Sequence, residues 1–372
     1  MGTSLDTLTI KGFKSIQELS AFKLNSLNVI VGANGAGKSN LIAFFKMLRA
    51  LIDGNLNRFV RDSGGASDLL FGGRKMTSEM TFETRFGDRG YRFTLMPTLA
   101  DSCVIEDEAC FLREPMGLGL WDLLSIGGNS ESDSRLAAEA HGNHPDMSYA
   151  KPVFDAISSW QVYHFHDTSQ SAGMRNYEIV QDNSVLRADA TNIGSFLLKL
   201  RNQFPSSYQA ILAAVRLVIP FFDDFILVPR LMGASEKVNL SWQQKGSDYP
   251  MQPYHLSDGS IRFICLATAL LQPNPPSTII IDEPELGLHP AAIAILAELI
   301  QQASLRTQVI VATQSPALID QFAIDDIVVV NRKGGASTFE RLNEADYAQW
   351  LEEYSVGELW TKNVIAGGPR YE

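Results

Sequence analysis

Two short groups of residues in this chain have the types and spacing that phosphate chemistry needs. The first is Gly32-x4-Gly37-Lys38-Ser39, the complete pattern of a phosphate-binding loop. Its glycines let successive backbone N–H groups surround phosphate oxygens at a helix N-terminus, and Lys38 is expected to reach the β and γ phosphates. The hydroxyl of Ser39 is expected to ligate Mg²⁺. The same cradle is expected to include Asn34, Gly35, Ala36 and Asn40.

The second group is the carboxylate pair Asp282-Glu283, which follows the apolar run 278–281. An α/β sheet presents ligand-binding residues at the carboxyl ends of its buried strands. We expect Asp282 to hold Mg²⁺ through the metal's water shell. Side chains alternate along a strand, so Glu283 points the other way and is placed to accept a proton from an attacking water. The alternative is two solvated acids, but a phosphate loop needs such a partner.

The elements around the loop support its interpretation. The runs 7–16 and 27–31 are β-branched and predict strands, and the second leads directly into Gly32. Apolar residues then recur at helical spacing from Leu41 to Leu51 and stop before Gly54. The loop is therefore expected between a strand and a helix, which is the context that a phosphate loop requires.

The rest of the chain predicts a mixed organisation. Helices at 260–271 and 291–303 alternate with strands at 278–281, 309–312 and 327–330, which indicates a parallel sheet with flanking helices. Glycine-punctuated alternation predicts antiparallel strands at 80–86, 91–95 and 103–112. Residues 114–151 are expected to form a mobile loop with one short helix. Helices are expected at 191–204 and 205–220, with strands at 224–229 and 237–242.

These patterns suggest three parts. Residues 1–113 hold the β lobe, the phosphate loop and the first helix, 114–250 form an inserted loop and helical arm, and 251–372 form the C-terminal lobe. A length of 372 residues alone indicates about two domains.

Composition excludes several classes of protein. With 45% hydrophobic and 20% charged residues the chain has enough apolar material to fold. The most apolar stretch, 210–222, is short and is interrupted by Arg216, so we expect a cytoplasmic protein without a membrane span. Three cysteines without a C-x-x-C pair argue against a disulfide framework. The net charge of -11 argues against a long nucleic-acid track, so such contacts must be local. Arg58, Arg61, Arg74 and Lys75 form a modest basic cluster that is either such a contact or ordinary surface solvation.

Leu256-Ser257-Asp258-Gly259-Ser260 begins a second helix with a serine and a glycine at its N-terminus. One nucleotide already has its phosphates held by the first such helix. Ser257 is therefore either a plain N-cap or part of a surface that closes on a nucleotide bound by another copy.

Three motifs in order carry a resemblance to a known family. Leu256–Gly259, Ile281–Pro290 and Ala312–Pro316 resemble the ABC-type ATPase heads of the RecF, SMC and OLD-like group. They are most similar to the stand-alone ATPases of the AAA_21 type, several of which belong to bacterial anti-phage systems. The resemblance implies an α/β P-loop NTPase of ABC-ATPase type, with an antiparallel β lobe and an inserted helical arm, that binds ATP and Mg²⁺.

The resemblance also implies roles for individual residues. Ser257 and Gly259 would contact the γ-phosphate bound by a second protomer, so that ATP joins two heads in a homodimer. Lys14 and Ser15 match a Phe-Lys/Arg-Ser stretch near the nucleotide, although Lys14 could be an ordinary surface lysine in a strand. Gln314 occupies a catalytic switch position that is often histidine; its amide can hydrogen-bond the γ-phosphate or the lytic water but carries no positive charge.

Two assignments stay open. The glutamine that the family places in its Q-loop is either Gln161 or Gln170. Between them, His164, His166 and Asp167 could hold a metal, or they could belong to a half-buried strand with satisfied imidazoles.

The functional hypothesis is ATP binding and hydrolysis coupled to dimer closure, in DNA repair or phage defence. The chain would act on DNA or control a separate effector such as a nuclease, because it contains no nuclease signature of its own. The alternative is a slow, nucleotide-gated scaffold that holds a partner protein with little turnover.

Overall fold

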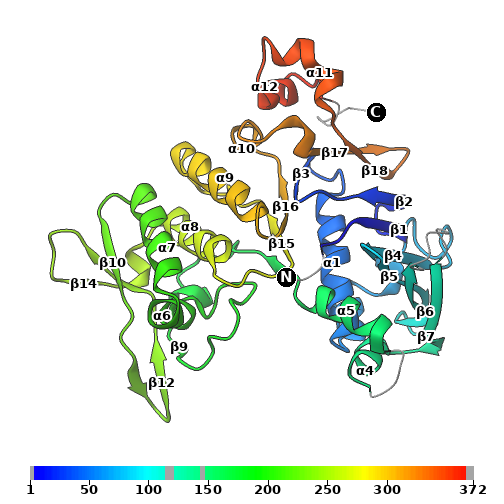
Figure 1. Ribbon diagram of the computed structural model, residues 1–372, viewed down its shortest axis with the longest axis horizontal. Coiled ribbons are helices and arrows are strands. Elements are labelled where there is room, and N and C mark those ends of the chain that lie inside the picture. The colour runs from blue at the N-terminus through cyan, green and yellow to red at the C-terminus, as the bar shows by residue number, and fades with distance from the viewer. Residues whose placement is uncertain (1–3, 114–120, 143–146, 366–372) are drawn as a thin grey trace.

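Two six-stranded sheets organise the chain in this computed structural model, which describes residues 4–113, 121–142 and 147–365 (Figure 1). One sheet is antiparallel, with the order β2-β1-β4-β5-β6-β7. The other has the order β18-β17-β3-β16-β15-β8 and is parallel except for its edge strand β18. The predicted mixed α/β fold class is confirmed.

The parallel sheet brings the ends of distant segments to one edge. Its strands are β3 (Leu27–Val31), β8 (Gln161–Tyr163), β15 (Thr278–Asp282), β16 (Gln308–Thr313), β17 (Ile327–Lys333) and β18 (Ala336–Arg341). Every residue of β3 and β16 is buried, as expected for strands covered on both faces. In the register, Ile281 lies opposite Val311, which lies opposite Val29. The residues that follow β3, β15 and β16 are therefore neighbours.

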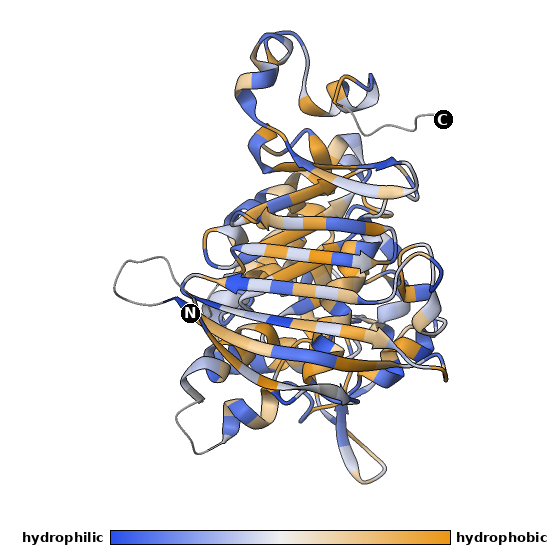
Figure 2. Cartoon of the chain, turned by 90° about the vertical axis from the view of Figure 1, so that its right-hand side faces the viewer, coloured by the Kyte–Doolittle hydropathy of each residue, from blue (hydrophilic) through white to orange (hydrophobic). Residues whose placement is uncertain are grey.

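The antiparallel sheet contains β1 (Thr7–Phe13), β2 (Ile16–Lys23), β4 (Met80–Phe86), β5 (Arg89–Pro97), β6 (Cys103–Arg113) and β7 (Trp121–Glu131). Burial alternates along β4, and Figure 2 shows hydrophilic and hydrophobic residues alternating along strands seen in that view. The single strand predicted at 7–16 is wrong. The chain turns at Lys14-Ser15, and Phe13 pairs with Ile16 across a hairpin.

The loop predicted after residue 113 is wrong for residues 121–131, which form β7 against β6. The glycines of β7 lie where its pairing with β6 is irregular, and they do not mark a loop. Gly128 has φ +130°, and a Cβ there would lie 2.5 Å from the Glu106 carbonyl oxygen, next to a register shift. The sheet therefore continues across the boundary that we propose at residue 113. Two helices follow, α4 (Leu136–His141) and α5 (Met147–Ser158), where one was predicted.

Helix α1 (Lys38–Ile52) lies between the two sheets. Its Phe44 packs with Phe82 of β4 and belongs to the same buried cluster as Ile280 and Ile310. The alternate residues Ile279 and Val309 face the opposite side of the parallel sheet, in a second cluster. The parallel sheet thus separates two hydrophobic cores.

The second core is covered by α6 (Ile193–Gln203), α7 (Pro205–Val218), α8 (Asp258–Leu271) and α9 (Pro290–Ser304). Two small sheets flank them, one of β10 (Phe222–Ile226), β13 (Ser241–Gln244) and β14 (Pro250–Met251), the other of β9 (Glu178–Ile179), β11 (Arg230–Met232) and β12 (Ser235–Val238). The predicted helices at 191–204 and 205–220 are confirmed. The strand predicted at 237–242 is wrong because the chain passes between the two small sheets there.

Short elements complete the fold. They are the helices α2 (Leu56–Asp62), α3 (Ala66–Leu69), α10 (Pro316–Ile319), α11 (Glu344–Leu351) and α12 (Val356–Thr361), and the 3-10 turns η1 (Gly173–Arg175), η2 (Pro253–His255) and η3 (Ile324–Asp326). In the described ranges no helix is both long and apolar enough to cross a membrane.

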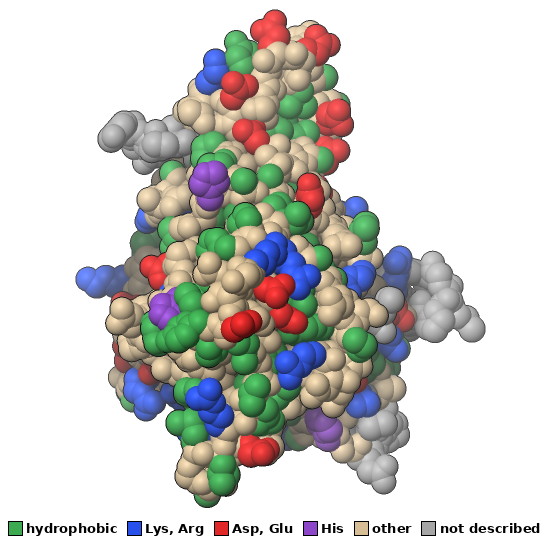
Figure 3. Space-filling model, turned by 90° about the vertical axis from the view of Figure 1, so that its left-hand side faces the viewer, with side chains coloured by type: hydrophobic (Ala, Val, Ile, Leu, Met, Phe, Trp, Pro, Cys, Tyr) green, Lys and Arg blue, Asp and Glu red, His purple; other side chains and the backbone are tan. Residues whose placement is uncertain are grey.

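Charges of both signs are interspersed on the face that carries the helical layer, and acidic side chains gather at the top of that view (Figure 3). The predicted basic cluster is partly neutralised by its neighbours. Arg58 and Arg61 lie 3.5 and 3.9 Å from Asp62, and Arg74 lies 2.7 Å from Asp101. These arginines therefore present less positive charge than their number suggests.

The aromatic packing around α1 predicts a large loss of stability in Phe82→Ala. Phe82 is fully buried, and its ring stacks on Phe93 and Phe44 at centroid distances of 4.8 and 5.6 Å. The free energy of unfolding should fall by about 3–5 kcal/mol, measured by chemical denaturation. Leu99→Ala removes a fully exposed side chain and should change it by less than about 0.5 kcal/mol. Equal effects of the two substitutions would contradict this packing.

Candidate functional site

The loop from Gly32 to Ser39 connects β3 to α1 at the carboxyl edge of the parallel sheet. Two of its glycines are required by the loop itself. A Cβ on Gly32 would lie 2.6 Å from the Val330 carbonyl oxygen. Gly37 has φ +120°, and a Cβ there would lie 2.1 Å from the Ser337 hydroxyl oxygen. The rim of the loop is open, since Asn34, Gly35 and Ser39 are exposed.

Lys38 is folded into the loop. Its Nζ donates hydrogen bonds to the carbonyl oxygens of Gly32 at 2.5 Å and Ala33 at 3.2 Å, and the residue is 6% exposed. Burial lowers the pKa of the ammonium group, and the nearby carboxylates of Glu283 and Asp282 oppose that shift. The structure therefore brings the lysine of the first predicted group beside the acids of the second.

A group of small polar side chains supports the loop from behind. Asn40 Nδ2 donates to the Ser15 hydroxyl at 2.6 Å, and that hydroxyl lies 2.6 Å from the Ser337 hydroxyl. Ser337 Oγ in turn donates to the Ala36 carbonyl oxygen at 2.5 Å. Ser15 and Asn40 thus lie at the predicted site, with their side chains bonded to each other. Ser337 was missed because no motif marks this position of β18.

Lys14 precedes this support in the β1–β2 turn, with φ 51°. It therefore lies in a turn and not in a regular strand. Burial lowers its pKa, and the Asp68 carboxylate acts in the opposite direction. Its contact with a nucleotide stays a prediction.

Asp282 ends β15 as predicted, but the orientation predicted for Glu283 from strand alternation is wrong, because Glu283 lies outside the strand. Asp282 is the last residue of the strand, and burial raises the pKa of its carboxyl group. Glu283 has φ 45°, a left-handed conformation that a non-glycine residue adopts at some cost in energy. Its backbone N–H donates to the Ala312 carbonyl oxygen at 2.8 Å, and its Oε1 accepts a hydrogen bond from Gln314 Nε2 at 3.1 Å. The proposed base and the switch residue are therefore in direct contact.

A third carboxylate, Glu285, completes this edge. Its Oε1 accepts a hydrogen bond from the Thr313 hydroxyl, and burial raises its pKa. Its Oε2 is buried and has no hydrogen-bond partner among the described residues. Sequence reasoning missed Glu285, although its position two residues after Glu283 was a usable signal.

The segment after β8 approaches the same edge and separates the two candidate glutamines. Tyr163 pairs with Ile281, so the carboxyl end of β8 faces Asp282. Gln161 lies at the opposite end of the strand, in a cavity beside the 273–276 loop, whereas Gln170 follows the carboxyl end. His166 Nε2 lies 3.0 Å from the Asp282 carbonyl oxygen. In the described chain no group of three or more His, Cys, Asp or Glu residues could hold a metal, so the site considered at 164–167 has no support.

Ser257 is the N-cap of α8, and its Oγ accepts a hydrogen bond from Ser260 N–H at 3.1 Å. Packing within this chain already requires a glycine at position 259, because a Cβ there would lie 2.3 Å from the Gly287 carbonyl oxygen. The first turn of α8 thus packs directly against the loop after β15. Contacts of Ser257 and Gly259 with a second protomer's nucleotide stay predictions.

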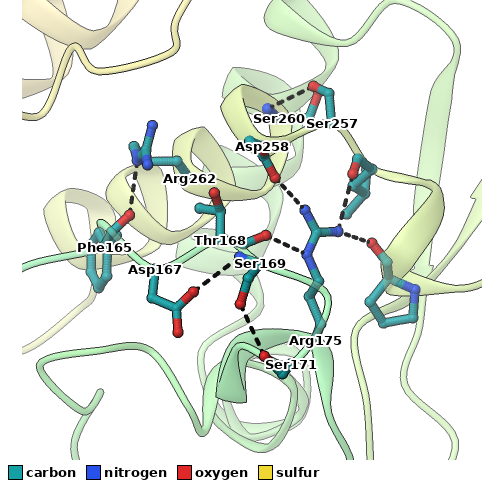
Figure 4. Close-up of polar contacts among 12 residues, drawn as sticks. Phe165, Asp167, Thr168, Ser169, Ser171, Arg175, Ser257, Asp258, Ser260 and Arg262 are labelled. Carbon is teal, nitrogen blue, oxygen red and sulfur yellow. Dashed lines mark hydrogen bonds and ion pairs between the residues drawn. The ribbon is translucent and has the colours of Figure 1, made fainter.

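A buried arginine on α8 reinforces this packing. Arg262 is 4% exposed and donates to the carbonyl oxygen of Phe165 at 2.8 Å (Figure 4). It also donates to the carbonyl oxygens of His166 at 3.1 Å and of Leu286. It therefore ties α8 to the segments after both β8 and β15. Sequence reasoning missed this residue, because an arginine inside a helix gives no signal of its partners.

The donor set at the edge suits a nucleotide with its magnesium ion. The Ser39 hydroxyl is exposed at the start of α1, and Asp282 supplies a carboxylate at the end of the neighbouring strand. Mg²⁺ prefers such hard oxygen ligands and keeps several waters, so few protein ligands are needed. Ser39 and Asp282 would hold it, while the loop amides and Lys38 would hold the phosphates.

Comparisons with known proteins agree with this geometry. The model of the AAA_21 family, described as "AAA domain, putative AbiEii toxin, Type IV TA system", matches residues 27–320. Among curated proteins, none matches the chain significantly.

Two solved structures share the fold. One is an SMC head bound to the C-winged helix domain of ScpA, with TM-score 0.57 and 17% identity, covering 93% of this chain and 99% of the other. The second, from Pyrococcus furiosus, is an SMC head domain with an extended coiled coil bound to the C-terminal domain of ScpA, with TM-score 0.55, 16% identity and coverages of 94% and 99%.

The loop geometry predicts different effects for two of its glycines. Gly37→Ala combines a left-handed φ with a clash at Ser337 and should lower the free energy of unfolding by about 2–4 kcal/mol. Gly35→Ala has φ +78° but open space around its Cβ, so the loss should be only about 1–2 kcal/mol. Chemical denaturation without nucleotide tests the difference. A larger loss at Gly35 would contradict the role assigned to Ser337.

Proposed function

This chain belongs to the AAA_21 family and has the fold of an ABC-type ATPase head, and we propose that it hydrolyses ATP within a head-to-head homodimer. The observation that carries the proposal is the placement of its two glycine-containing helix N-termini. Helix α1 packs in the core on one face of the parallel sheet, and α8 packs in the core on the other. Phosphates held at α1 leave Ser257 exposed and without a phosphate of its own.

A two-fold arrangement gives Ser257 a ligand. In a symmetric dimer the same pair of surfaces meets twice, so Ser257 of each copy faces the phosphate loop of the other. None of the hydrogen bonds in the described ranges joins Ser257 to residues 32–39; its hydroxyl contacts Ser260 alone. ATP would thus lie between the two heads and hold them together, and its hydrolysis would release them.

The residues at the edge divide the chemistry among them. Lys38 neutralises phosphate charge, and Ser39 and Asp282 hold the metal, which supplies charge stabilisation to the phosphates when bound. Glu283 takes the proton of the attacking water. Gln314, which contacts Glu283, orients that water or the γ-phosphate through its amide. Lys14 and Ser15 lie in the turn beside the loop and are proposed to contact the nucleotide.

We further propose that this cycle serves DNA repair or phage defence in the cytoplasm, through DNA itself or through a separate effector protein such as a nuclease. The family description, which names a putative toxin of a toxin–antitoxin system, supports the defence part of this proposal. The SMC heads that share the fold were solved with the partner protein ScpA, which supports a partner protein in general terms.

A second function is favoured by one contact. Gln314 Nε2 donates to Glu283 Oε1 at 3.1 Å, which occupies an oxygen that the lytic water would need. If this bond persists with ATP bound, hydrolysis is slow, and the chain is a nucleotide-gated scaffold that holds its partner while ATP remains.

Glu283→Gln should trap the dimer. The amide keeps the shape of the side chain but cannot accept the proton, so turnover should fall about 100-fold or more while ATP binding persists. Light scattering coupled to gel filtration should then show a dimer with ATP and a monomer without it. Adding Ser257→Arg should abolish that dimer, because a long cation at the α8 N-terminus blocks the opposing loop. If the double variant still dimerises with ATP, the in-trans role of Ser257 is wrong.

Steady-state hydrolysis separates the two functions. For the DNA-linked ATPase, turnover per chain should rise with protein concentration and rise again with duplex DNA. Glu283→Gln is the control for contaminating activity. Negligible turnover in every condition, together with tight ATP binding, would instead establish the scaffold.

A further inference from the structure

Arg175 is a buried guanidinium that the proposed chemistry does not use. It ends η1, in the segment that follows β8, and its side chain is 5% exposed. Its only acidic contact among the described ion pairs is Asp258, whose own side chain is 68% exposed. Such a buried charge is costly unless its donors are satisfied, so its hydrogen bonds indicate what it does.

Four hydrogen bonds satisfy it (Figure 4). Nε donates to the Thr168 carbonyl oxygen at 2.9 Å, within its own segment. Nη1 donates to the carbonyl oxygens of Pro253 at 2.6 Å and Leu256 at 3.0 Å, and Nη2 donates to Asp258 Oδ1 at 3.0 Å. Three of the four contacts therefore lie on residues 253–258, immediately before and after Ser257.

The shape of the guanidinium makes these contacts a geometric restraint. Its donors lie in one rigid plane, so acceptors bonded to it are held at fixed relative positions. Leu256 and Asp258 flank Ser257, and both are bonded to this plane. Rotation or displacement of Ser257 would break one or both bonds.

The start of the segment 165–175 is bonded to the end of β15, where Asp282 lies. The His166 ring contacts the Asp282 carbonyl oxygen at 3.0 Å, and Arg262 of α8 binds the carbonyl oxygens of Phe165 and His166. Residues 165–175 thus connect the end of β15 with the start of α8 through hydrogen bonds. This continuity gives a physical route by which one copy's own nucleotide edge and its Ser257 keep a common orientation.

We propose that Arg175 is a positioning residue for Ser257: it sets the α8 N-terminus in the orientation that engages ATP bound by a second copy. The inference rests on the proposed in-trans role of Ser257. Arg175 itself touches neither nucleotide, so its loss should spare binding at the phosphate loop and weaken only the closure of the dimer.

The test compares Arg175→Met with Arg216→Met, each in the Glu283→Gln background. Arg216 is a control of the same residue type: its guanidinium also binds a carbonyl oxygen, that of Asp223 at 2.6 and 2.8 Å, but it lies far along the chain from Ser257 and its side chain is 38% exposed. Arg175→Met should weaken ATP-driven dimerisation about tenfold or more, since several charge-assisted bonds are lost. Its ATP affinity, measured by calorimetry, should stay within about twofold. Arg216→Met should change neither quantity.

Two further variants distinguish a loss of positioning from a failure to fold. Arg175→Lys keeps the charge but not the planar fork, so it should restore folding without restoring full dimerisation. Asp258→Ala removes one exposed partner and should weaken dimerisation less than Arg175→Met does. If Arg175→Lys dimerises like the parent protein, charge alone suffices and the positioning role is wrong.

Mixing two variants that are each inactive tests whether activity can be recovered, which would not occur if Arg175 served only to fold its own chain. Arg175→Met has an intact phosphate loop, and Lys38→Ala has an intact Ser257 region. A mixed dimer would therefore contain one complete composite site out of two. In an equal mixture of the two variants, each with Glu283 intact, about half of the dimers are mixed, so turnover should recover to about a quarter of normal. No recovery would overturn the proposal, because Arg175 would then act on its own chain's nucleotide or on folding.

The controls keep the two proposals distinguishable. If Glu283→Gln does not dimerise with ATP, or Ser257→Arg leaves the dimer intact, the proposed function itself fails. If both behave as expected while Arg175→Met dimerises normally, only the role of Arg175 is overturned.

Discussion

The placement of α1 between two sheets is the constraint on which the rest of the structure depends. The helix is apolar on several sides, with Phe44 and Phe45 both buried, so it needs a sheet against each face. Meeting that need puts its N-terminus at the carboxyl edge of the parallel sheet. Residues from the ends of β3, β15 and β16 then share a small volume. The proximity of the phosphate loop, the carboxylates and Gln314 is a consequence of this packing.

The same packing sets the electrostatics of the edge. Burial lowers the pKa of Lys38 and raises those of Asp282 and Glu285, because desolvation disfavours the charged form of each group. A nucleotide adds negative phosphates and its metal adds positive charge, which favours binding of the two together. Glu283 differs from the other acids because its left-handed backbone turns the chain out of the strand. In the proposed function, its hydrogen bond to Gln314 is the contact that would separate a fast ATPase from a slow one.

Two cores separated by one sheet also place the N-termini of α1 and α8 on opposite sides of that sheet, which is the basis of the proposed dimer. Helix α8 covers the core opposite α1, and its start is oriented by buried arginines instead of by a ligand. Arg262 reaches from α8 to the segments after two strands, and Arg175 reaches back from one of those segments to the start of α8. These reciprocal bonds make the segment 165–175 a connection between the end of β15 and the start of α8, which we propose faces a second copy.

Much of the site follows from local chemistry that the sequence displays directly. The phosphate loop, the acids after β15 and the flanking strand and helix are set by residue type and short spacing, because each depends on neighbours in the chain. Ser337, Arg175 and Arg262 could not be found in this way, since their partners lie many residues away and carbonyl acceptors leave no trace in a sequence. The glycines at 127–128 predicted a loop, but these residues form part of β7 because they pair with β6 across the sheet. Only the tertiary fold decided that the carboxyl end of β8, which leads to Gln170, lies at the same sheet edge as Asp282, because this depends on the parallel pairing of β8 with β15.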